Sequence, residues 1–383
     1  MSILLEPPPP RAYMLGVTGE QWGRTQPPAT TGLNVPMSSM WKHLRNRRRM
    51  NTPPWGSDFM NTDKRVAWID QVRGISILLV IFGHVWRNAY EDYALSPKIF
   101  GVVFDAIYLF HMPVFFFVSG IFLTRSLTSI TIRDFLSSRF VNLIFPVIVW
   151  AITYQILRTI LGQPTTARDF LIAPFRPDDM FWFIWALLLC QAVGAILLRL
   201  KRRWVIGLAA IVSAIMTIAF LPVDFSNYPF RTGLGLTVYM LGGFTGAVVT
   251  RRVWPGVVAF IAAQIIAAEF PGSIYYVAAS LVATLGFLWA MAALGPKRRS
   301  YAAMAWLGRN SFPIYLIHGA VIGMHVLLIK VGITLPIAIV AIPGVLALLA
   351  SVAGTIVLDR LGLGVLIGLR HQKRTRPVRQ ANV

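Results

Sequence analysis

RVAWIDQVRGISILLVIFGH, at residues 65–84, is an apolar run of helix length in which an aspartate, an arginine and a histidine follow the opening Arg65. Asp70 and Arg73 are three residues apart, so they are neighbours on a helix surface. Arg73 and His84 are eleven residues apart, about three turns, which places both on one face roughly 16 Å apart along the axis. Ionisable groups inside a membrane helix are costly and mark functional sites. The stretch therefore predicts a transmembrane helix with a functional polar face; the alternative is a snorkelling arginine and an interfacial histidine.

The composition is that of an integral membrane protein. Of 383 residues, 56% are hydrophobic and 13% are charged, and the mean hydropathy is +0.63. Soluble domains have about 25% charged residues. The single cysteine, Cys190, excludes a disulfide within the chain and a cysteine-based metal site, and no metal ion is expected.

Apolar runs of spanning length recur along the chain. Because every backbone polar group in lipid must bond internally, these runs predict an all-α polytopic helical bundle. About ten spans are expected, of which 253–270 is the weakest. Their approximate limits are 68–86, 100–123, 140–161, 180–198, 204–221, 232–250, 253–270, 274–294, 311–330 and 334–358.

The distribution of basic residues orients these spans. Of the 36 lysines and arginines, 28 fall in the segments on one side of the predicted membrane, seven fall on the other side, and Arg73 lies within the first span. Cytoplasmic segments carry the excess of positive charge. Both termini are therefore predicted to be cytoplasmic, with the loop 158–179 on the opposite side.

The ends of the chain differ from its centre. Residues 1–60 are rich in proline, glycine, serine and threonine and contain a basic cluster at 41–49, which predicts a disordered cytoplasmic segment without a signal peptide. The cluster is expected to set topology and to contact anionic lipid headgroups rather than nucleic acid. Residues 61–360 form the predicted membrane domain, and 361–383 a basic cytoplasmic tail.

Further polar residues lie inside the predicted spans. His111 falls near the middle of the second run, just before Pro113, which is expected to free a backbone carbonyl and kink the helix. Ser119 and the following Gly120 allow close helix approach. Arg139 lies at the inner end of the third run.

Two aromatic segments complete the candidates. Trp182 belongs to an aromatic cluster at the outer end of the fourth run, where an interfacial belt is expected and stacking on a sugar is the alternative. In the ninth run, Ser311 is a predicted N-cap, and Tyr315 and His318 share one helix face.

Several chemical classes are excluded by missing motifs. The sequence has no His-Glu-x-x-His metal pattern, no Gly-x-Ser-x-Gly elbow, no Walker lysine loop and no dinucleotide glycine fingerprint. A histidine can remove the proton of an attacking hydroxyl, and a guanidinium can bind phosphate or stabilise developing negative charge. This set of groups fits acyl transfer to an alcohol.

The same residues resemble the membrane acyltransferase-3 family. Arg73, ten intervening residues and His84 match its signature, and the segments 111–120, 133–146, 181–183 and 311–318 are similar to its later blocks, in order. The line from Asp70 to His84 looks nearest to the fucose 4-O-acetylase-like branch. That branch includes O-acetyltransferases that decorate the fucose of rhizobial nodulation signals.

The resemblance implies a multi-pass enzyme of the bacterial inner membrane that transfers acetyl from acetyl-CoA to a hydroxyl of a sugar or glycolipid. Acetyl-CoA would be a substrate, with no bound cofactor. His84 is expected to be the general base, Arg73 a substrate-binding or charge-stabilising group, and Asp70 the group that orients Arg73. A flippase for a lipid-linked glycan and an acyltransferase for a lipid or peptide are the alternatives. Substrate-binding candidates are His111, Ser119, Arg139, Trp182, Tyr315 and His318.

Overall fold

The computed structural model describes the membrane domain and leaves the ends of the chain aside. Residues 1–66 and 370–383 lie outside the described residues, and with them the predicted N-terminal segment, its basic cluster and most of the predicted tail. The described ranges are 67–93, 97–123, 132–176, 180–200, 202–220, 227–246, 250, 252–295, 300–322, 328–329, 331–333 and 335–369.

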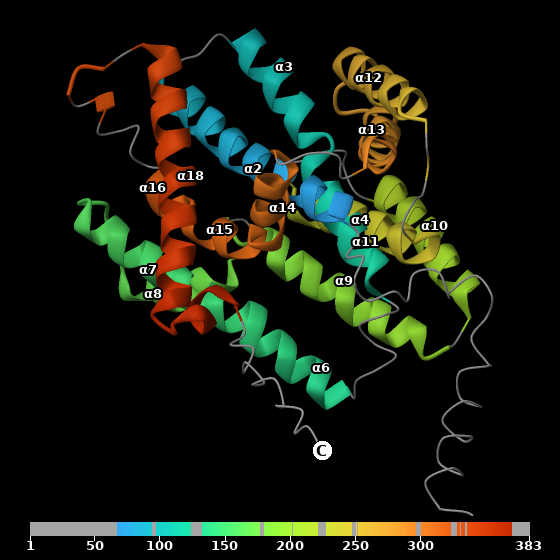
Figure 1. Cartoon of the computed structure of the whole chain (residues 1–383), viewed down its shortest axis with the longest axis horizontal. Helices are drawn as coiled ribbons and strands as arrows, with labels where there is room; N and C mark the ends of the chain where they lie inside the picture. The colour runs from blue at the N-terminus through green and yellow to red at the C-terminus, as the bar shows by residue number, and fades with distance from the viewer. Residues whose placement is uncertain are drawn as a thin grey trace, which may run out of the picture. The chain divides into compact units, whose positions relative to one another are not determined.

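Within these ranges the regular elements are all helical, which confirms the predicted all-α class (Figure 1). Helical residues occur in each of the ten predicted runs; the second run is divided between two helices, and in the ninth the described helices are the short α15 and α16. The elements are α2 (Ala67–Tyr93), α3 (Pro97–Tyr108), α4 (His111–Ile121), α6 (Ile132–Arg139), η1 (Phe140–Ile144), α7 (Phe145–Ile160), α8 (Ala167–Ile172), η2 (Ala173–Phe175), α9 (Trp182–Leu198), α10 (Arg203–Phe220), α11 (Tyr228–Thr245), α12 (Trp254–Glu269), α13 (Ile274–Leu294), α14 (Ser300–Arg309), α15 (Ser311–Ile317), α16 (Gly319–Ile322), α18 (Pro336–Arg360) and η3 (Gly364–Ile367).

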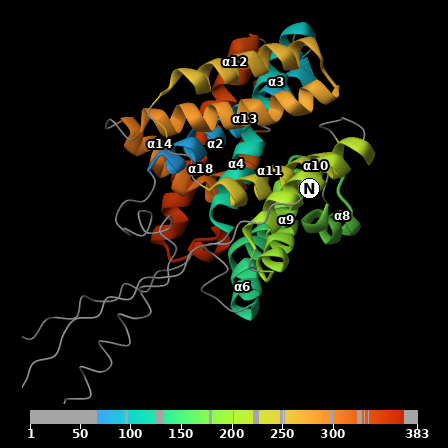
Figure 2. The same ribbon diagram turned by 90° about the vertical axis from the view of Figure 1, so that its right-hand side faces the viewer.

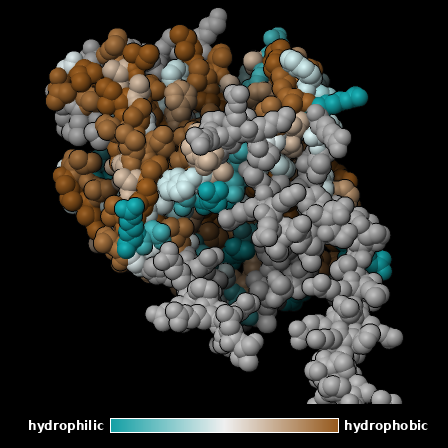
Figure 3. All heavy atoms as spheres, in the orientation of Figure 1, coloured by the Kyte–Doolittle hydropathy of each residue, from teal (hydrophilic) through white to brown (hydrophobic). Residues whose placement is uncertain are grey.

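The surface of this bundle is strongly apolar. Large side chains such as Ile160, Trp254 and Ile337 are 73%, 77% and 71% exposed, and brown, apolar residues dominate the coloured part of the face in Figure 3. Soluble proteins rarely expose apolar surface on this scale. Five helical segments in the described part are long and apolar enough to cross a membrane: Trp68–Tyr90, Ile99–Ile121, Ser137–Ile160, Ile274–Leu294 and Ile337–Arg360.

The predicted second span is broken in its middle. α3 ends at Tyr108 and α4 begins at His111, with a turn between them. Pro113 lacks the N–H that would bond to the carbonyl of Leu109 in a continuous helix. The Ser280 hydroxyl of α13 donates to that carbonyl at 2.5 Å, so the freed group is satisfied. The predicted kink is confirmed, and the break places His111 at the first position of α4.

A second irregularity follows Arg139. The chain makes a π-helical turn, η1, between α6 and α7. Pro146 cannot donate to the carbonyl of Asn142, four residues earlier, and its ring excludes the regular helical path there. π-helical turns within helices occur frequently at functional sites.

Two glycines bring α2 and α14 into backbone contact. A Cβ atom on Gly74 would lie 2.0 Å from the Met304 carbonyl oxygen, and one on Gly308 would lie 1.7 Å from the Asp70 carbonyl oxygen. Because no side chain fits between these backbones, the two helices form a closely joined pair. α14 occupies a segment that the hydropathy pattern left as a connection between the eighth and ninth runs.

The predicted close approach at Gly120 is also present. A Cβ atom there would lie 2.0 Å from the Tyr239 carbonyl oxygen of α11. α12 and α13 lie alongside each other in the same manner, as Figure 2 shows, with Gly256 against the Gly286 carbonyl oxygen. Small residues at such crossings are typical of helix packing in membranes.

Candidate functional site

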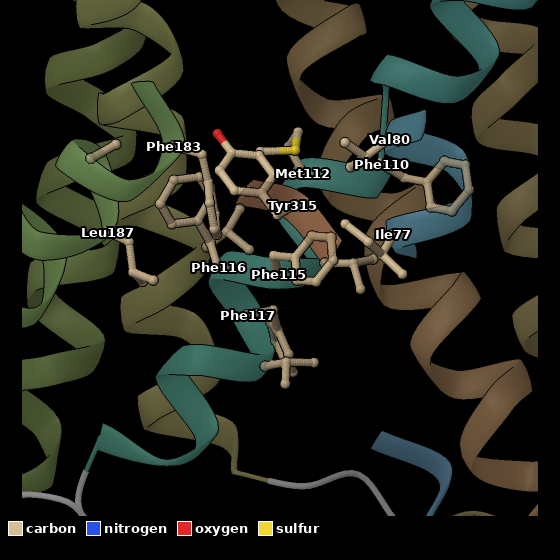
Figure 4. Close-up of a cluster of buried hydrophobic side chains, with 14 of the residues drawn as sticks. Ile77, Val80, Phe110, Met112, Phe115, Phe116, Phe117, Phe183, Leu187 and Tyr315 are labelled. Atoms are coloured by element: carbon tan, nitrogen blue, oxygen red, sulfur yellow. The ribbon is translucent and has the colours of Figure 1, made fainter. Parts of the chain in front are cut away.

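A partly open cavity of about 180 Å³ lies among α2, α4, the α6–η1 segment, α9 and α15. Figure 4 shows much of its apolar wall, with side chains from α2, α4, α9 and α15 turned toward one another. The structure brings four of the predicted site residues into the wall of this cavity: Arg73, Ser119, Arg139 and Tyr315. The other lining residues are Ile77, Val80, Met112, Phe115, Leu143, Phe183, Ile184, Leu187, Gln191, Ser311 and Phe312.

Two arginines supply the cationic side of the cavity. Arg73 donates from Nη2 to the Ser311 hydroxyl at 3.0 Å. Arg139 lies in the last turn of α6, and its guanidinium carbon is 4.8 Å from the centre of the Phe135 ring. A guanidinium group presents planar, paired donors that match phosphate and carboxylate oxygens. The cavity can therefore hold an anionic ligand with an apolar portion.

The contact with Ser311 corrects one expectation. The sequence predicts Ser311 as the N-cap of the ninth span, but α15 begins at Ser311 and its N-cap is Asn310, without a side-chain capping bond. The serine hydroxyl accepts a hydrogen bond from Arg73 instead.

His84 and His318 lie next to each other beyond Tyr315. Their ring centres are 5.4 Å apart with a tilt of 50°, and the His318 ring centre is 5.7 Å from that of Tyr315. His318 is the residue that follows α15. α15 thus contacts Arg73 of α2 at its first residue and His84 at its end, which fits the predicted common face of these two side chains.

Two histidine rings are each hydrogen-bonded to the backbone carbonyl of a residue three or four positions earlier. Nδ1 of His318 lies 2.7 Å from the carbonyl oxygen of Tyr315, and Nδ1 of His111 lies 2.7 Å from that of Ile107. A carbonyl oxygen only accepts, so Nδ1 is the donor in both rings and the neutral form of each keeps its lone pair on Nε2. His111 and His318 are both buried.

Asp70 has a basic neighbour on another helix. Its Oδ2 atom lies 3.7 Å from Nη1 of Arg309, at the end of α14. The sequence singled out Arg73 as the partner of Asp70, and the role of Asp70 in orienting Arg73 stays a prediction. Arg309 could not be identified as a neighbour from sequence, because the two residues are far apart along the chain.

Trp182 lies away from the cavity wall. The guanidinium carbon of Arg231 is 4.3 Å from the centre of its indole ring, a cation–π contact. The Phe183 ring is 6.2 Å from the same indole at a steep angle. One face of Trp182 is therefore already covered, which leaves less of the ring for a sugar.

Gln191 is a candidate that the sequence analysis missed. Its side chain lines the cavity from α9, and its Oε1 atom is buried without a hydrogen-bond partner among the described residues. A buried amide oxygen without a partner is costly, and a ligand N–H or O–H would satisfy it. The signal was present in the sequence, because Gln191 is the one amide in the apolar run 180–198.

Comparison with known proteins identifies the family. Residues 66–359 match the acyltransferase-3 model, described as an acyltransferase domain. The chain is similar to nodulation protein NolL of Sinorhizobium fredii, with 27% identity over 186 residues that cover 46% of this chain and 49% of that protein. It is also similar to nodulation protein NolL of Mesorhizobium japonicum, with 27% identity over 221 residues, or 55% and 58% of the two chains.

The chain spans about half the length of the curated relatives it matches. No solved structure matches it. The family model covers most of the chain and includes every predicted site residue. The chain belongs to the acyltransferase-3 family of integral membrane acyltransferases.

Proposed function

We propose that this protein transfers an acetyl group from acetyl-CoA to a hydroxyl group of a sugar. The observation that carries this proposal is the arrangement along α2. Arg73 lines a cavity that also contains Arg139, and His84 lies about three turns further along the same helix, beside His318. Anion binding at one end and a candidate base at the other are what transfer from an acyl-CoA to an alcohol requires.

The cavity suits the donor. The guanidinium groups of Arg73 and Arg139 would bind the phosphate oxygens of the donor. The apolar wall would cover the pantetheine arm, and the unpartnered Oε1 atom of Gln191 would accept from an amide N–H of that arm. Ser119 and the Tyr315 ring complete the wall.

The acceptor is proposed from similarity. The curated relatives are named for nodulation, and the segment from Asp70 to His84 resembles the fucose-specific branch of the family. A fucosylated glycan or lipo-oligosaccharide is therefore the acceptor we propose. A lipid or peptide hydroxyl could react at the same site.

Acetyl transfer can be measured directly with purified full-length protein in lipid nanodiscs. With radiolabelled acetyl-CoA and 4-nitrophenyl fucoside as the acceptor probe, we expect release of free CoA to depend on the fucoside and label to appear in an alkali-labile ester. A second set of reactions would contain the 4-deoxy fucoside as the control. If neither the fucoside nor its 4-deoxy analogue gave a labelled ester, the proposal would be contradicted. Movement of a glycan across the bilayer without acetylation would favour the flippase alternative.

We also propose ten spans in the bacterial inner membrane, with residues 1–60 and 361–383 in the cytoplasm. Consecutive spans must run in opposite directions, and the contacts support this. Gly207 near the beginning of α10 lies against Phe244 in the last turn of α11. Gly256 in the first turn of α12 lies against Gly286 and Ala290, in the second half of α13.

Spans separated by an even number of crossings must run in the same direction. α4 and α9 belong to the second and fourth predicted runs. Phe116 packs on Phe183 at the beginning of α9, and Leu123 packs on Gly194 further along it, so the two helices are parallel. α15 and α2, which belong to the ninth and first runs, are also parallel, because Arg73 contacts Ser311 and the later His84 contacts His318.

Reporter fusions test this topology. Fusions after Gly295 and at Val383 are expected to report the cytoplasm, and a fusion after Pro164 is expected to report the periplasm. The fusion at Gly295 is the internal control for the C-terminal one. The same compartment for Pro164 and Val383 would mean that the span count is wrong.

A further inference from the structure

We propose that His318 is a positioning residue for His84, and that the two imidazoles act as a dyad. His318 would accept a hydrogen bond from one ring nitrogen of His84, leaving the other nitrogen of His84 to remove the proton from the acceptor hydroxyl. This inference rests on the proposed function, because it assigns a partner to the base of that reaction.

The first argument is the unpartnered nitrogen of His318. The residue has no exposed surface. Its Nδ1 donates to the Tyr315 carbonyl oxygen at 2.7 Å, so in the neutral ring Nε2 is an acceptor. Nε2 is buried and has no hydrogen-bond partner among the described residues. A histidine that served only to fill the core would leave this nitrogen buried and unpaired, which is energetically costly.

The second argument is how firmly the ring is held. The Tyr154 hydroxyl of α7 donates to the Leu316 carbonyl oxygen, and the Tyr315 hydroxyl donates to the Met180 carbonyl oxygen. Gly319 follows His318 and lies so close to Met180 that a Cβ atom would be 2.2 Å from its Cε atom. These contacts fix the end of α15, and the Tyr315 carbonyl fixes the tautomer of His318.

The third argument is the position of His84. Its ring centre is 5.4 Å from that of His318, close enough for facing ring nitrogens to approach hydrogen-bond distance. Catalytic hydrogen bonds are commonly long before substrate binds and shorten in the complex. Nε2 of His318, which has no hydrogen-bond partner among the described residues, is therefore an acceptor within reach of the His84 ring.

Acetyl transfer through this dyad needs no reactant besides acetyl-CoA and the acceptor. The acceptor oxygen bonds to the thioester carbonyl carbon while its proton passes to His84. The carbon–sulfur bond then breaks, and the departing thiolate takes the proton from His84 to give free CoA and an ester. His318 keeps its own proton on Nδ1 and stabilises the protonated His84 through Nε2, as the third member of a catalytic triad orients and stabilises its histidine.

Substitution of His318 separates this role from packing. His318→Phe keeps a ring of similar size but has no acceptor, and His318→Gln keeps an acceptor oxygen. In the nanodisc assay with acetyl-CoA and 4-nitrophenyl fucoside, we expect His318→Phe to lower kcat about tenfold with the KM values for both substrates unchanged. We expect His318→Gln to recover most of that loss. His318→Leu gives a second acceptor-free variant if the phenylalanine is not tolerated.

A double variant tests the coupling. If the dyad exists, adding His318→Phe to His84→Ala should not reduce the residual rate further, because the partner it serves is already gone. Equal losses in His318→Phe and His318→Gln, a raised acceptor KM, or additive losses in the double variant would each overturn the dyad. Wild-type protein without acetyl transfer would remove the proposed function and the dyad together, whereas an active wild type with a fully active His318→Phe would remove the dyad alone.

Discussion

His84→Ala is expected to lower the rate of O-acetyl transfer by about 10²–10⁴-fold, the usual contribution of a general base. The half-buried ring lies beside His318 at the end of the helix face that begins with Arg73. Without it, the acceptor hydroxyl has no group at this position to take its proton. The measurement is the initial rate of ester formation in nanodiscs at saturating acetyl-CoA.

Phe82→Ala is the matched control for this variant. Phe82 lies on the same helix, is 38% exposed and stacks on Trp86 with ring centres 5.7 Å apart. Its removal deletes a larger ring from α2 without touching the histidines, so near-normal turnover and insertion are expected. If His84→Ala retained more than a tenth of the wild-type rate, His84 would not be the base, and His111→Ala would be the next variant to measure.

Arg73→Lys is expected to lower kcat/KM by about 10- to 100-fold, even though the charge is kept. Lysine is a compact point charge, whereas the planar guanidinium can bind two oxygens at once while Nη2 donates to Ser311. Loss of one charge-assisted hydrogen bond to the donor accounts for a change of this size. The measurement is kcat/KM for acetyl-CoA, with the acceptor probe at a fixed concentration.

Ser311→Ala separates the two contacts of Arg73. It removes the hydroxyl that accepts from Nη2 and leaves the guanidinium in the cavity wall. We expect a loss of less than about tenfold, as for one neutral hydrogen-bond partner. Equal losses in Arg73→Lys and Ser311→Ala would show that Arg73 acts only through Ser311 and does not bind the donor.

The sequence was most informative about α2. Hydropathy located the helix, and the spacing of Arg73 and His84 placed them on a common face, because helical periodicity depends only on local geometry. Pro113 and Gly120 were also interpretable, since a missing N–H and a missing side chain have local consequences that need no knowledge of the fold. The family could be identified because its motifs are contiguous in sequence.

The cavity could not be derived in the same way. Its polar residues come from helices that are distant along the chain, as Arg139 and Gln191 show, and one sequence does not say which helix faces meet. The pairing of Asp70 with Arg309 was missed for the same reason. α14 was overlooked because it is short, and its contact with α2 depends on the backbone at Gly308 rather than on an apolar stripe.

Because α15 runs parallel to α2, the two helices fix the distance between the two ends of the site. Eleven residues of α2 fix about 16 Å between the levels of Arg73 and His84, and a helix of this kind does not stretch. Under the proposed function, the site selects a donor whose anionic end and thioester are separated by this distance. A short acyl thioester without phosphates would reach His84 but leave the Arg73 end empty, and would lose the remote binding energy that holds the reacting carbon in place.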